Sequence, residues 1–538
     1  MNSQDALLFD NIHTDLQGRN DSSAGTAGTA QPKRILLTGG AGFIGSVLVR
    51  KLVLNYPEYF VLVIDKLDYC SSLENLRPFI SSHQDPRTKD ISTDATSNCD
   101  RYSNFKFMQG DIADLSFVQR AMEDHAIDTV VHLAAQTHVD KSFGESIEFS
   151  RSNVLGTHAM LEAARKTFSS SAGVNHSAVD KGFAAETSKG GPKGPCRFIY
   201  ISTDEVYGEV QFDQPNCKED SPLAPSNPYS ATKAAAECMV QAYYKSFHLP
   251  AIITRSNNVY GPFQYPEKIF PKFIMSLLSE KRSDAGACDE SMGAFNNANG
   301  DRGRSARRGN RDGGGHCYIH GSGQHSRTYL YVADVANALD VILHRGEVGQ
   351  VYNIGAGHEV NNLALAQDLI HRMVAPTPDS ADCSSQAPGA KFEGDIKSQP
   401  GCDRGLVHDG EQRAQQHLKS CRACAERIVF VEDRAFNDLR YAVDSSRLFG
   451  LGWRPLVDFE DGIGKTIEWY RKHGRTWWGD IHRALYPHSI KQNVEDSAAT
   501  SSANSPASSQ PSSPRIWPNM ITMRPPQASC TTDGYLDK

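Results

Sequence analysis

A glycine-rich turn constrains the fold of this chain more than any other sequence feature. It directly follows the apolar run Arg34–Thr38, which is expected to be a buried strand, and its glycines are Gly39, Gly42 and Gly45. Glycines at this spacing permit a tight turn, close approach of the backbone to a pyrophosphate, and close packing of the following helix. Asp65 ends the next expected strand, where it can accept hydrogen bonds from ribose hydroxyls and repel a 2′-phosphate. The pattern predicts a dinucleotide site that prefers NAD to NADP.

Strand-like and helix-like segments alternate along the apolar blocks of the sequence. Strands are expected at 34–38, 60–65, 105–110, 129–134, 198–202, 251–255 and 351–354. Helices are expected at 43–54, 117–125, 147–167, 229–247, 332–344 and 363–374. This alternation predicts an α/β fold, in which a doubly wound parallel Rossmann sheet is accompanied by a smaller α/β substrate-binding lobe.

Polar tracts rich in Ser, Gly and Asp interrupt these blocks and are expected to be long disordered insertions. We expect a disordered N-terminal segment at 1–31 and a Rossmann domain at 32–258, with insertions at 81–103 and 169–195 and a further strand and helix near 328–355. We expect the substrate-binding lobe at 259–327 and 356–487, with insertions at 282–315 and 376–425, and a disordered tail at 488–538. The Arg-rich run 302–308 is interpreted as a solvated loop.

Composition excludes several classes of function. The net charge of -7 and the pI near 6.3 give no reason to expect binding to nucleic acid or to an anionic membrane. The first thirty residues have no cationic start followed by an apolar stretch, so a secretory signal is not expected. No run approaches the roughly 18 apolar residues of a membrane helix. Twelve cysteines in such a chain are most simply reduced thiols in a cytoplasmic protein.

One cysteine pair has metal-ligand spacing. Cys421 and Cys424 form a C-x-x-C in a polar segment, but the sequence offers no second C-x-x-C or H-x-x-x-H partner. We interpret them as incidental thiols in a loop and expect no metal site.

Polar side chains also end the expected strand 198–202. Thr203, Asp204 and Glu205 follow it directly, at the edge where open α/β sheets bind ligands. A protonated Asp204 could act as an acid and Glu205 as a base, if their environments separate their pKa values. The alternative is that Thr203 and Asp204 merely cap a helix.

A tyrosine and a lysine follow one helical turn apart. Tyr229 and Lys233 form a Y-x-x-x-K pattern on the expected helix 229–247, so both face the same way. A nearby cation favours the phenolate form of a tyrosine, which could then take a hydroxyl proton. As a bare pattern this is an ordinary amphipathic helix, but behind a dinucleotide fingerprint it predicts hydride chemistry.

Together these motifs resemble the extended short-chain dehydrogenase/reductase superfamily and, within it, the nucleotide-sugar 4,6-dehydratases. The resemblance covers the apolar blocks and none of the insertions. It implies an NAD-dependent hydro-lyase that oxidises the sugar at C4, eliminates water across C5 and C6, and returns the hydride to C6. In that scheme Tyr229 is the base at O4, Lys233 supports it, Thr203 bonds O4, Asp204 is the acid at the C6 hydroxyl, and Glu205 is the base at C5.

The resemblance also implies binding residues. Expected to bind the cofactor are Gly39, Gly42, Phe43, Ile44, Gly45, Asp65, Lys66, Asp111, Ile112, Leu133, Ala134, Ala135, Thr137, Ser152, Tyr229 and Lys233. Expected to bind the nucleotide sugar are Thr203, Asn258, Lys268, Ile269, Arg327, Asn362, Arg434 and Asn437, with the two arginines on the diphosphate.

The nucleotide of the sugar donor is less constrained. Bacterial dTDP-glucose dehydratases usually have Pro-Gly-His after Asp433-Arg434, where this chain has Ala435-Phe436-Asn437. That run and Trp477-Trp478-Gly479-Asp480 look closer to the UDP-glucose 4,6-dehydratase domain of plant rhamnose synthases, although eukaryotic dTDP-glucose dehydratases are also similar. UDP-glucose is therefore favoured over dTDP-glucose, and an early step towards rhamnose is expected.

Two other functions fit parts of the sequence. A nucleotide-sugar epimerase or decarboxylase would share the fold but typically lacks the Asp204-Glu205 pair. A non-catalytic NAD-sensing interaction protein would have no reason to keep all four of Asp204, Glu205, Tyr229 and Lys233. Relatives commonly form homodimers through helices equivalent to 147–167 and 229–247, so a homodimer is expected, while a downstream reductase partner is left open.

Overall fold

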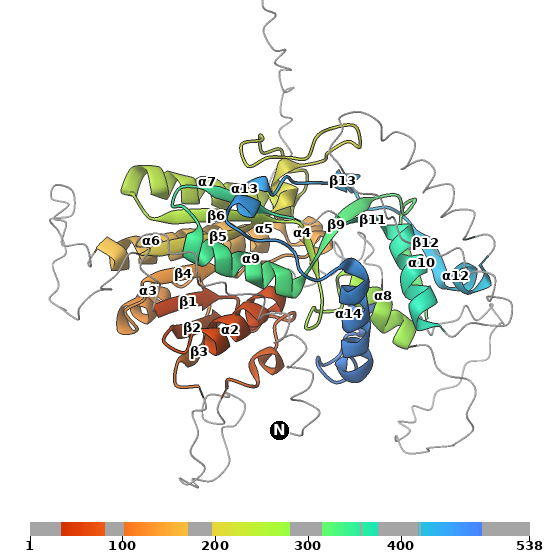
Figure 1. Ribbon diagram of the computed structural model, residues 1–538, viewed down its shortest axis with the longest axis horizontal. Helices are drawn as coiled ribbons and strands as arrows, with labels where there is room; N and C mark the ends of the chain where they lie inside the picture. The colour runs from red at the N-terminus through yellow and green to blue at the C-terminus, as the bar shows by residue number, and fades with distance from the viewer. Residues whose placement is uncertain are drawn as a thin grey trace, which may run out of the picture.

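The computed structural model describes residues 34–80, 102–169, 196–279, 315–355, 358–374, 418 and 421–486. It contains a large sheet with helices on both faces, beside a smaller lobe of helices and short strands (Figure 1). The expected terminal segments, the run 302–308 and nearly all of the four expected insertions lie outside these residues.

The large sheet is parallel throughout and has seven strands in the order β10-β6-β5-β4-β1-β2-β3. Its strands are β1 (Arg34–Thr38), β2 (Phe60–Asp65), β3 (Phe105–Gln109), β4 (Thr129–His132), β5 (Arg197–Thr203), β6 (Ala251–Ser256) and β10 (Val351–Ile354). The strand order reverses between β1 and β4, which opens a crevice at the carboxyl ends of the strands. The predicted Rossmann sheet is confirmed, with strand ends differing by at most two residues.

Helices cover both faces because the strands are apolar on both sides. Ile35 and Leu37 of β1 pack on one side, while Leu36 packs on the other. One layer contains α2 (Phe43–Asn55) and α9 (Val332–Arg345), and the other contains α3 (Leu115–Asp124), α6 (Gly156–Ser169) and α7 (Pro228–Phe247).

One expected helix is not uniform. The range 147–167 divides into α5 (Ser146–Phe149), a π-helical turn η2 (Ser150–Leu155) and α6. Before it lies α4 (Val139–Gly144). Single π-turns inside helices commonly lie at functional sites, and Ser152 lies within this one.

The smaller lobe is built on short strands. β9 (Ser326–Tyr331) pairs with β7 (Asn258–Tyr260), β11 (Glu359–Asn361) and β13 (Arg440–Tyr441), while β8 (Cys317–His320) pairs with β12 (Ile428–Val431). Its helices are α8 (Ile269–Leu278), α10 (Asn362–Met373), α12 (Arg422–Arg427), α14 (Phe459–His473) and α15 (His482–Leu485). β9 runs directly into α9, so the two lobes are continuous in the chain.

A C-terminal segment returns to the large sheet. α13 (Ser446–Gly450) lies beside β10, and Leu448 and Trp453 are buried in the core formed by α2 and α9. Trp453 Nε1 donates to the Asp334 carbonyl oxygen at 3.1 Å. This part of the expected lobe range 356–487 therefore packs on the Rossmann core.

The expected insertion 376–425 also needs a correction at its end. Cys421 and Cys424 do not lie in an exposed loop: Cys424 is on α12, and the two side chains are 2% and 0% exposed. Among the described residues, no helix is both long and apolar enough to cross a bilayer.

Candidate active site

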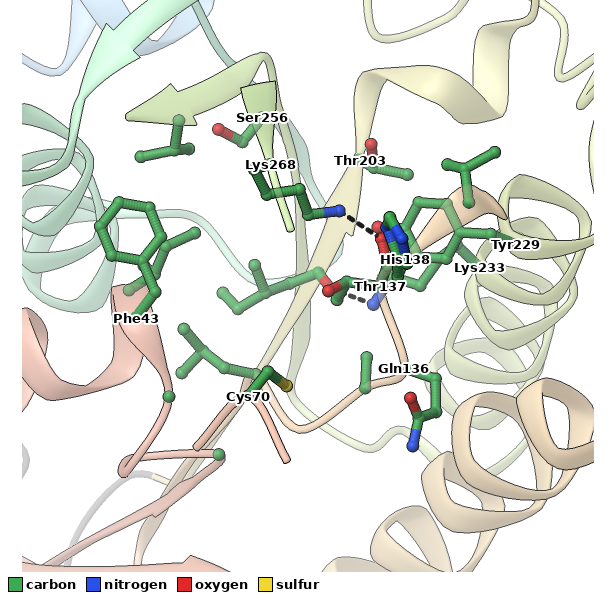
Figure 2. Close-up of a pocket in the computed structure, with 18 of the residues that line it drawn as sticks. Phe43, Cys70, Gln136, Thr137, His138, Thr203, Tyr229, Lys233, Ser256 and Lys268 are labelled. Atoms are coloured by element: carbon green, nitrogen blue, oxygen red, sulfur yellow. Dashed lines mark hydrogen bonds between the residues drawn. The ribbon is translucent and has the colours of Figure 1, made fainter. Parts of the chain in front are cut away.

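A cavity of about 420 Å³ lies at the carboxyl ends of the central strands, between the large sheet and the smaller lobe (Figure 2). Its lining contains every expected site residue except Asp204. The structure therefore gathers the expected cofactor and substrate residues around one space, although they come from positions 39 to 437.

The glycine turn is shaped by close backbone approaches. Gly39 has φ +73°, and a Cβ there would meet the backbone nitrogen of Ala134 at 2.8 Å. A Cβ at Gly45 would lie 2.3 Å from the Gly39 carbonyl oxygen. Gly42 is the N-cap of α2 and supplies no side-chain cap, so the first amides of the helix face the cavity without a competing side-chain oxygen. This cradle fits a pyrophosphate.

Asp65 ends β2 at the rim of the cavity. Its Oδ2 accepts from the Ala41 amide at 3.0 Å and its Oδ1 from the Leu67 amide at 2.8 Å. Burial raises the Asp65 pKa, and these two backbone hydrogen bonds oppose the rise. Each carboxylate oxygen can accept a further hydrogen bond, which suits a ribose diol.

Lys66 does not offer an isolated positive charge beside Asp65. Its Nζ lies 3.0 Å from Asp68 Oδ2, and the same oxygen accepts from Gln136 Nε2 at 2.6 Å. Because Asp68 neutralises Lys66, this lysine gives little support to a 2′-phosphate, which agrees with the expected preference for NAD.

The other expected cofactor residues line the cavity from the start of α2, the segments that follow β3 and β4, and the π-turn. They are Phe43, Ile44, Asp111, Ile112, Leu133, Ala134, Ala135, Thr137 and Ser152. Lys268 from the smaller lobe donates its Nζ to the Thr137 carbonyl oxygen at 2.7 Å, which joins the two walls (Figure 2).

The Thr-Asp-Glu motif lies where β5 meets a 3₁₀ turn, η3 (Asp204–Tyr207). Thr203 is the N-cap, and its Oγ1 accepts from the Glu205 amide at 3.3 Å. The prediction that Thr203 caps a helix is therefore correct. This cap holds the carboxylates of Asp204 and Glu205 in place.

Asp204 is 2% exposed and lies just behind the cavity wall. It accepts from Asn257 Nδ2 at 2.6 Å and from Thr203 Oγ1 at 3.2 Å. Burial, followed by the charge of Glu205, raises the Asp204 pKa to about 7, while the Asn257 and Thr203 hydrogen bonds oppose the rise. A carboxyl with this pKa carries a proton in a large fraction of molecules near neutral pH, as an acid requires.

Glu205 lines the cavity itself. Its Oε2 accepts from Asn227 Nδ2 at 3.2 Å. Burial raises the Glu205 pKa, and the charge of Lys268 and the Asn227 hydrogen bond lower it. Two adjacent carboxyls thus have different partners and different access to the cavity.

Tyr229 and Lys233 lie on α7 and are 8% and 3% exposed. Lys233 Nζ donates to the Ile201 carbonyl oxygen at 2.5 Å and lies 4.4 Å from the Tyr200 ring centroid. Burial lowers the Lys233 pKa to about 7. The Tyr229 pKa is raised, opposite to the expected direction, because burial and the charge of Glu205 outweigh the hydrogen bond from Thr203.

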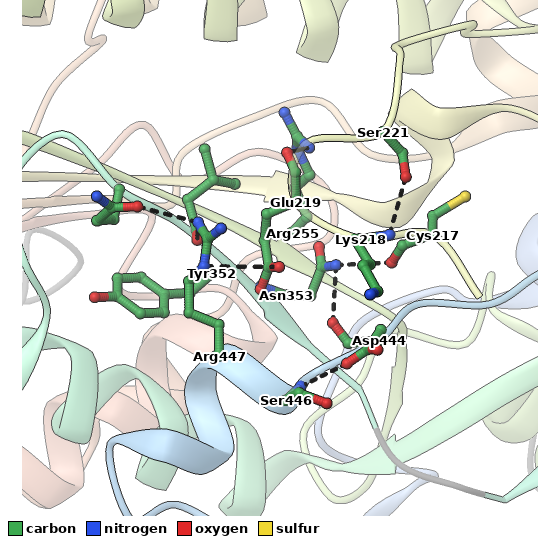
Figure 3. Close-up of polar contacts among 12 residues, drawn as sticks. Cys217, Lys218, Glu219, Ser221, Arg255, Tyr352, Asn353, Asp444, Ser446 and Arg447 are labelled. Carbon is green, nitrogen blue, oxygen red and sulfur yellow. Dashed lines mark hydrogen bonds and ion pairs between the residues drawn. The ribbon is translucent and has the colours of Figure 1, made fainter. Parts of the chain in front are cut away.

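A buried polar network holds η3 against α7. Tyr207 donates to Asn353 Oδ1 at 2.8 Å and accepts from the Arg255 guanidinium at 2.7 Å. The same guanidinium pairs with Glu237 of α7 at 2.7 Å. Asn353 also donates to the carbonyl oxygens of Cys217 and Asp444, both at 3.0 Å, which ties in the C-terminal segment (Figure 3).

Two asparagines next to the reactive carboxyls were not anticipated. Asn257 holds Asp204 and Asn227 holds Glu205. Asn227 is also the N-cap of α7, where it accepts from the Ser230 amide. Its place directly before Pro228 is a helix-start signal that could have identified it.

The substrate-side residues come from the smaller lobe. Arg327 lies 4.6 Å from the Tyr441 ring centroid and donates to Asn437 Oδ1 at 3.3 Å. Arg434 is paired with Asp140, with 2.6 Å between its Nε and Oδ1. The two expected arginines share one cavity with Asn258, Lys268, Ile269, Asn362 and Asn437.

The comparisons with known proteins agree on one family. Residues 35–355 match the profile of the NAD dependent epimerase/dehydratase family. The chain is 38% identical over 462 residues to a trifunctional UDP-glucose 4,6-dehydratase/UDP-4-keto-6-deoxy-D-glucose 3,5-epimerase/UDP-4-keto-L-rhamnose-reductase of Arabidopsis thaliana, covering 86% of this chain. It is 37% identical over 462 residues to the dTDP-D-glucose 4,6-dehydratase of Mus musculus, covering 85% of this chain and 94% of the mouse protein.

The chain spans about half the length of the plant relative, 50% of it. Among solved structures, the dTDP-glucose 4,6-dehydratase DesIV of Streptomyces venezuelae, with NAD bound, matches with a TM-score of 0.55 and 28% identity. The match covers 83% of this chain and 98% of the bacterial one.

Proposed function

Since the chain belongs to the NAD dependent epimerase/dehydratase family, we propose that it is an NAD-dependent nucleotide-sugar 4,6-dehydratase, a hydro-lyase acting on an NDP-glucose. The observation that carries the proposal is the Asp204-Glu205 pair beside Tyr229. An acid with a pKa of about 7 and a second carboxyl at the cavity wall are what water elimination needs in addition to redox chemistry.

NAD fits the glycine cradle, Asp65 and the wall 133–135. The pyrophosphate would lie at the first turn of α2, and the ribose hydroxyls would bond to Asp65. When bound, NAD would supply the hydride acceptor for oxidation at C4 and, once reduced, the hydride donor for C6. Lys233 would hold the nicotinamide ribose, and the lining residues exclude water from the reacting carbon.

The substrate side suits a nucleoside diphosphate. Arg327 and Arg434 provide guanidinium groups for the diphosphate, and Asn258, Lys268, Asn362 and Asn437 provide polar contacts for the rest of the donor. The Arg434–Asp140 ion pair would open or share its charge when the diphosphate arrives. We favour UDP-glucose, and dTDP-glucose is the alternative that the assay below separates.

The chain's own groups divide the proton transfers among them. Tyr229 takes the O4 proton during oxidation, and Thr203 bonds O4. The new C4 ketone acidifies the C5 proton, which Glu205 removes, while Asp204 protonates the C6 hydroxyl so that it leaves as water. Glu205 then returns its proton to C5 as hydride reaches C6, giving the 4-keto-6-deoxy sugar. Each assisted proton transfer is worth about 10²–10⁴ in rate.

Burial raises the pKa of Tyr229 and lowers the pKa of Lys233. A Tyr229 that starts as a phenol must lose its proton before it can act as a base. The positive charge of bound NAD and a protonated Lys233 would both favour the phenolate.

We also propose a homodimer and a cytoplasmic location. Large apolar side chains are exposed on α5, the π-turn and α7, which contact one another. Ile147 is 77% exposed, Leu155 59% and Phe247 52%. Exposed apolar side chains concentrated on neighbouring helices are typical of subunit interfaces. Light scattering of wild type and Leu155→Asp tests this: a dimeric wild type and a monomeric variant are expected, and a monomeric wild type would refute it.

The proposal is tested by offering the purified chain UDP-glucose and dTDP-glucose separately and following the sugar by mass spectrometry. Loss of one water from at least one donor is expected. A product of unchanged mass but altered stereochemistry would indicate an epimerase, and loss of carbon dioxide from the corresponding glucuronate would indicate a decarboxylase. Tight NAD binding with no turnover of any donor would favour the non-catalytic alternative.

A variant locates the reaction step. Glu205→Gln should bind NAD and substrate and oxidise C4, but stall before water loss. Glu58→Gln removes an exposed carboxylate that does not line the cavity and should behave as wild type. Normal turnover by Glu205→Gln would mean that another group is the C5 base.

A further inference from the structure

A second cluster of reactive side chains lies in the smaller lobe. His371 on α10 meets Cys421 and Cys424 at the start of α12, with all three potential ligand atoms within 4.8 Å of one another. None of the three lines the cavity described above. The proposed dehydratase chemistry therefore makes no use of them.

The distances within the cluster match a tetrahedral metal site. His371 Nε2 lies 3.4 Å from Cys421 Sγ and 3.5 Å from Cys424 Sγ. In a tetrahedral zinc site with Zn–S near 2.3 Å and Zn–N near 2.0–2.1 Å, the N···S edge is about 3.5 Å. The two N···S distances are thus those that a shared zinc ion imposes, and the two sulfur atoms lie within 4.8 Å of each other.

Burial and charge also suit a metal. Cys421 and Cys424 are 2% and 0% exposed and belong to the apolar core of the smaller lobe, together with Leu369 and Ile370 of α10. Two thiolates neutralise the charge of one Zn²⁺, so the loaded cluster would carry no net charge into this core. A C-x-x-C pair with a histidine from another helix suits zinc better than it suits metals that prefer oxygen ligands, such as Mg²⁺ or Ca²⁺.

We propose that His371, Cys421 and Cys424 bind one Zn²⁺ as a structural site. The described residues supply three ligands, which leaves one tetrahedral position for water or another donor. The ion would fix α12 to α10, although 49 residues lie between His371 and Cys421 in the sequence. Directly after α12 comes β12, and then the segment with Arg434 and Asn437, so the site would steady the substrate side of the cavity from behind.

Metal content is the direct test. The reduced full-length protein, purified without chelators, should carry about one zinc per chain by mass spectrometry of the metal. X-ray absorption should show two sulfur ligands at about 2.3 Å and nitrogen or oxygen ligands at about 2.0 Å. Co²⁺ loaded in place of zinc should give the thiolate charge-transfer and visible bands of a tetrahedral site.

Variants assign the ligands. Cys421→Ala, Cys424→Ala and His371→Ala should each lower the zinc content to well below one per chain. Cys317→Ala is the matched control, because Cys317 is a fully buried thiol in the same core but outside the cluster, and it should keep the metal. If the ligand variants fail to fold, the X-ray absorption spectrum of the wild type still tests the proposal, because it counts the sulfur ligands of the metal.

Three outcomes would overturn the proposal. The first is reduced wild-type protein that takes up neither zinc nor cobalt. The second is zinc retained at full content when both cysteines are replaced, since the chain has twelve cysteines and the metal would then be held elsewhere. The third is a Cys421–Cys424 disulfide in protein kept under reducing conditions, which would make the pair a redox site instead.

Discussion

Replacing Asp204 by asparagine should lower the activity and should make the free energy of unfolding less dependent on pH. Asp204 is 2% exposed, and burial together with Glu205 raises its pKa to about 7. In the unfolded chain an aspartate has a pKa of about 3.9. The folded state therefore binds this proton more tightly, and stability is lost as pH rises from about 4 to about 7.

The magnitude follows from the difference between the two pKa values. A shift of about 3 units corresponds to about 4 kcal/mol in total at about 1.36 kcal/mol per unit. Between pH 5 and pH 8.5 the wild type should lose about 2.5 kcal/mol of this, because at pH 5 the unfolded chain is already ionised at this position while the folded chain is still protonated. Asparagine does not titrate and can still accept from Asn257.

Urea unfolding of both proteins at several pH values measures the effect. The free energy of unfolding of Asp204→Asn minus that of wild type should rise by about 2.5 kcal/mol from pH 5 to pH 8.5. The activity of the variant should fall by about 10²–10⁴ because it has no proton to donate. Asp213→Asn removes an exposed carboxylate from the following loop and is the control. A difference that stays flat or falls with pH would refute the assignment of Asp204 as a buried acid that titrates near neutrality.

Three further variants test other parts of the account. Gly45→Ala would place a Cβ 2.3 Å from the Gly39 carbonyl oxygen and should weaken NAD binding by about tenfold or more in calorimetry; unchanged affinity would contradict the cradle. Tyr207→Phe removes a hydrogen bond from Arg255 and one to Asn353 and should cost about 2 kcal/mol in urea unfolding, whereas a loss below about 0.5 kcal/mol would mean that the network does not hold η3. Tyr229→Phe should slow C4 oxidation by about 10²–10⁴ with little change in nucleotide affinity, and equal losses in both would assign Tyr229 to binding rather than proton transfer.

Much of the Rossmann domain could be predicted because its signals are local. The strands of the large sheet are buried on both faces, so they read as continuous apolar runs such as Phe198–Ile201. The glycine turn and the end of β2 have a fixed spacing, which places Gly39, Gly45 and Asp65 around one cavity.

The smaller lobe was harder to predict because its elements are short and depend on distant partners. β7, β11 and β13 have three, three and two residues, too few for an alternating pattern. The six-residue helix α12 begins in a polar tract, and the burial of Cys424 becomes evident only when α10 packs beside it. The π-turn at 150–155 contains no Gly or Pro to mark a break, so the sequence predicts an ordinary helix there.

The site residues show the same division. Thr203, Glu205, Tyr229 and Lys233 were identified from motifs and line the cavity. The partners that set their properties are distant in sequence: Asn257 is 53 positions from Asp204, and Asp140 is 294 positions from Arg434. A pairing of that kind leaves no periodic or local signal, so neither contact could be predicted from the sequence.

The central claim is that one sugar loses water while its own C4 hydrogen moves to C6. An NDP-glucose labelled with deuterium at C4 tests this directly, with the product analysed by mass spectrometry and NMR. The account predicts a 4-keto-6-deoxy product, lighter by one water, with deuterium retained at C6. A product of unchanged mass, or a dehydrated product with no deuterium at C6, would contradict it.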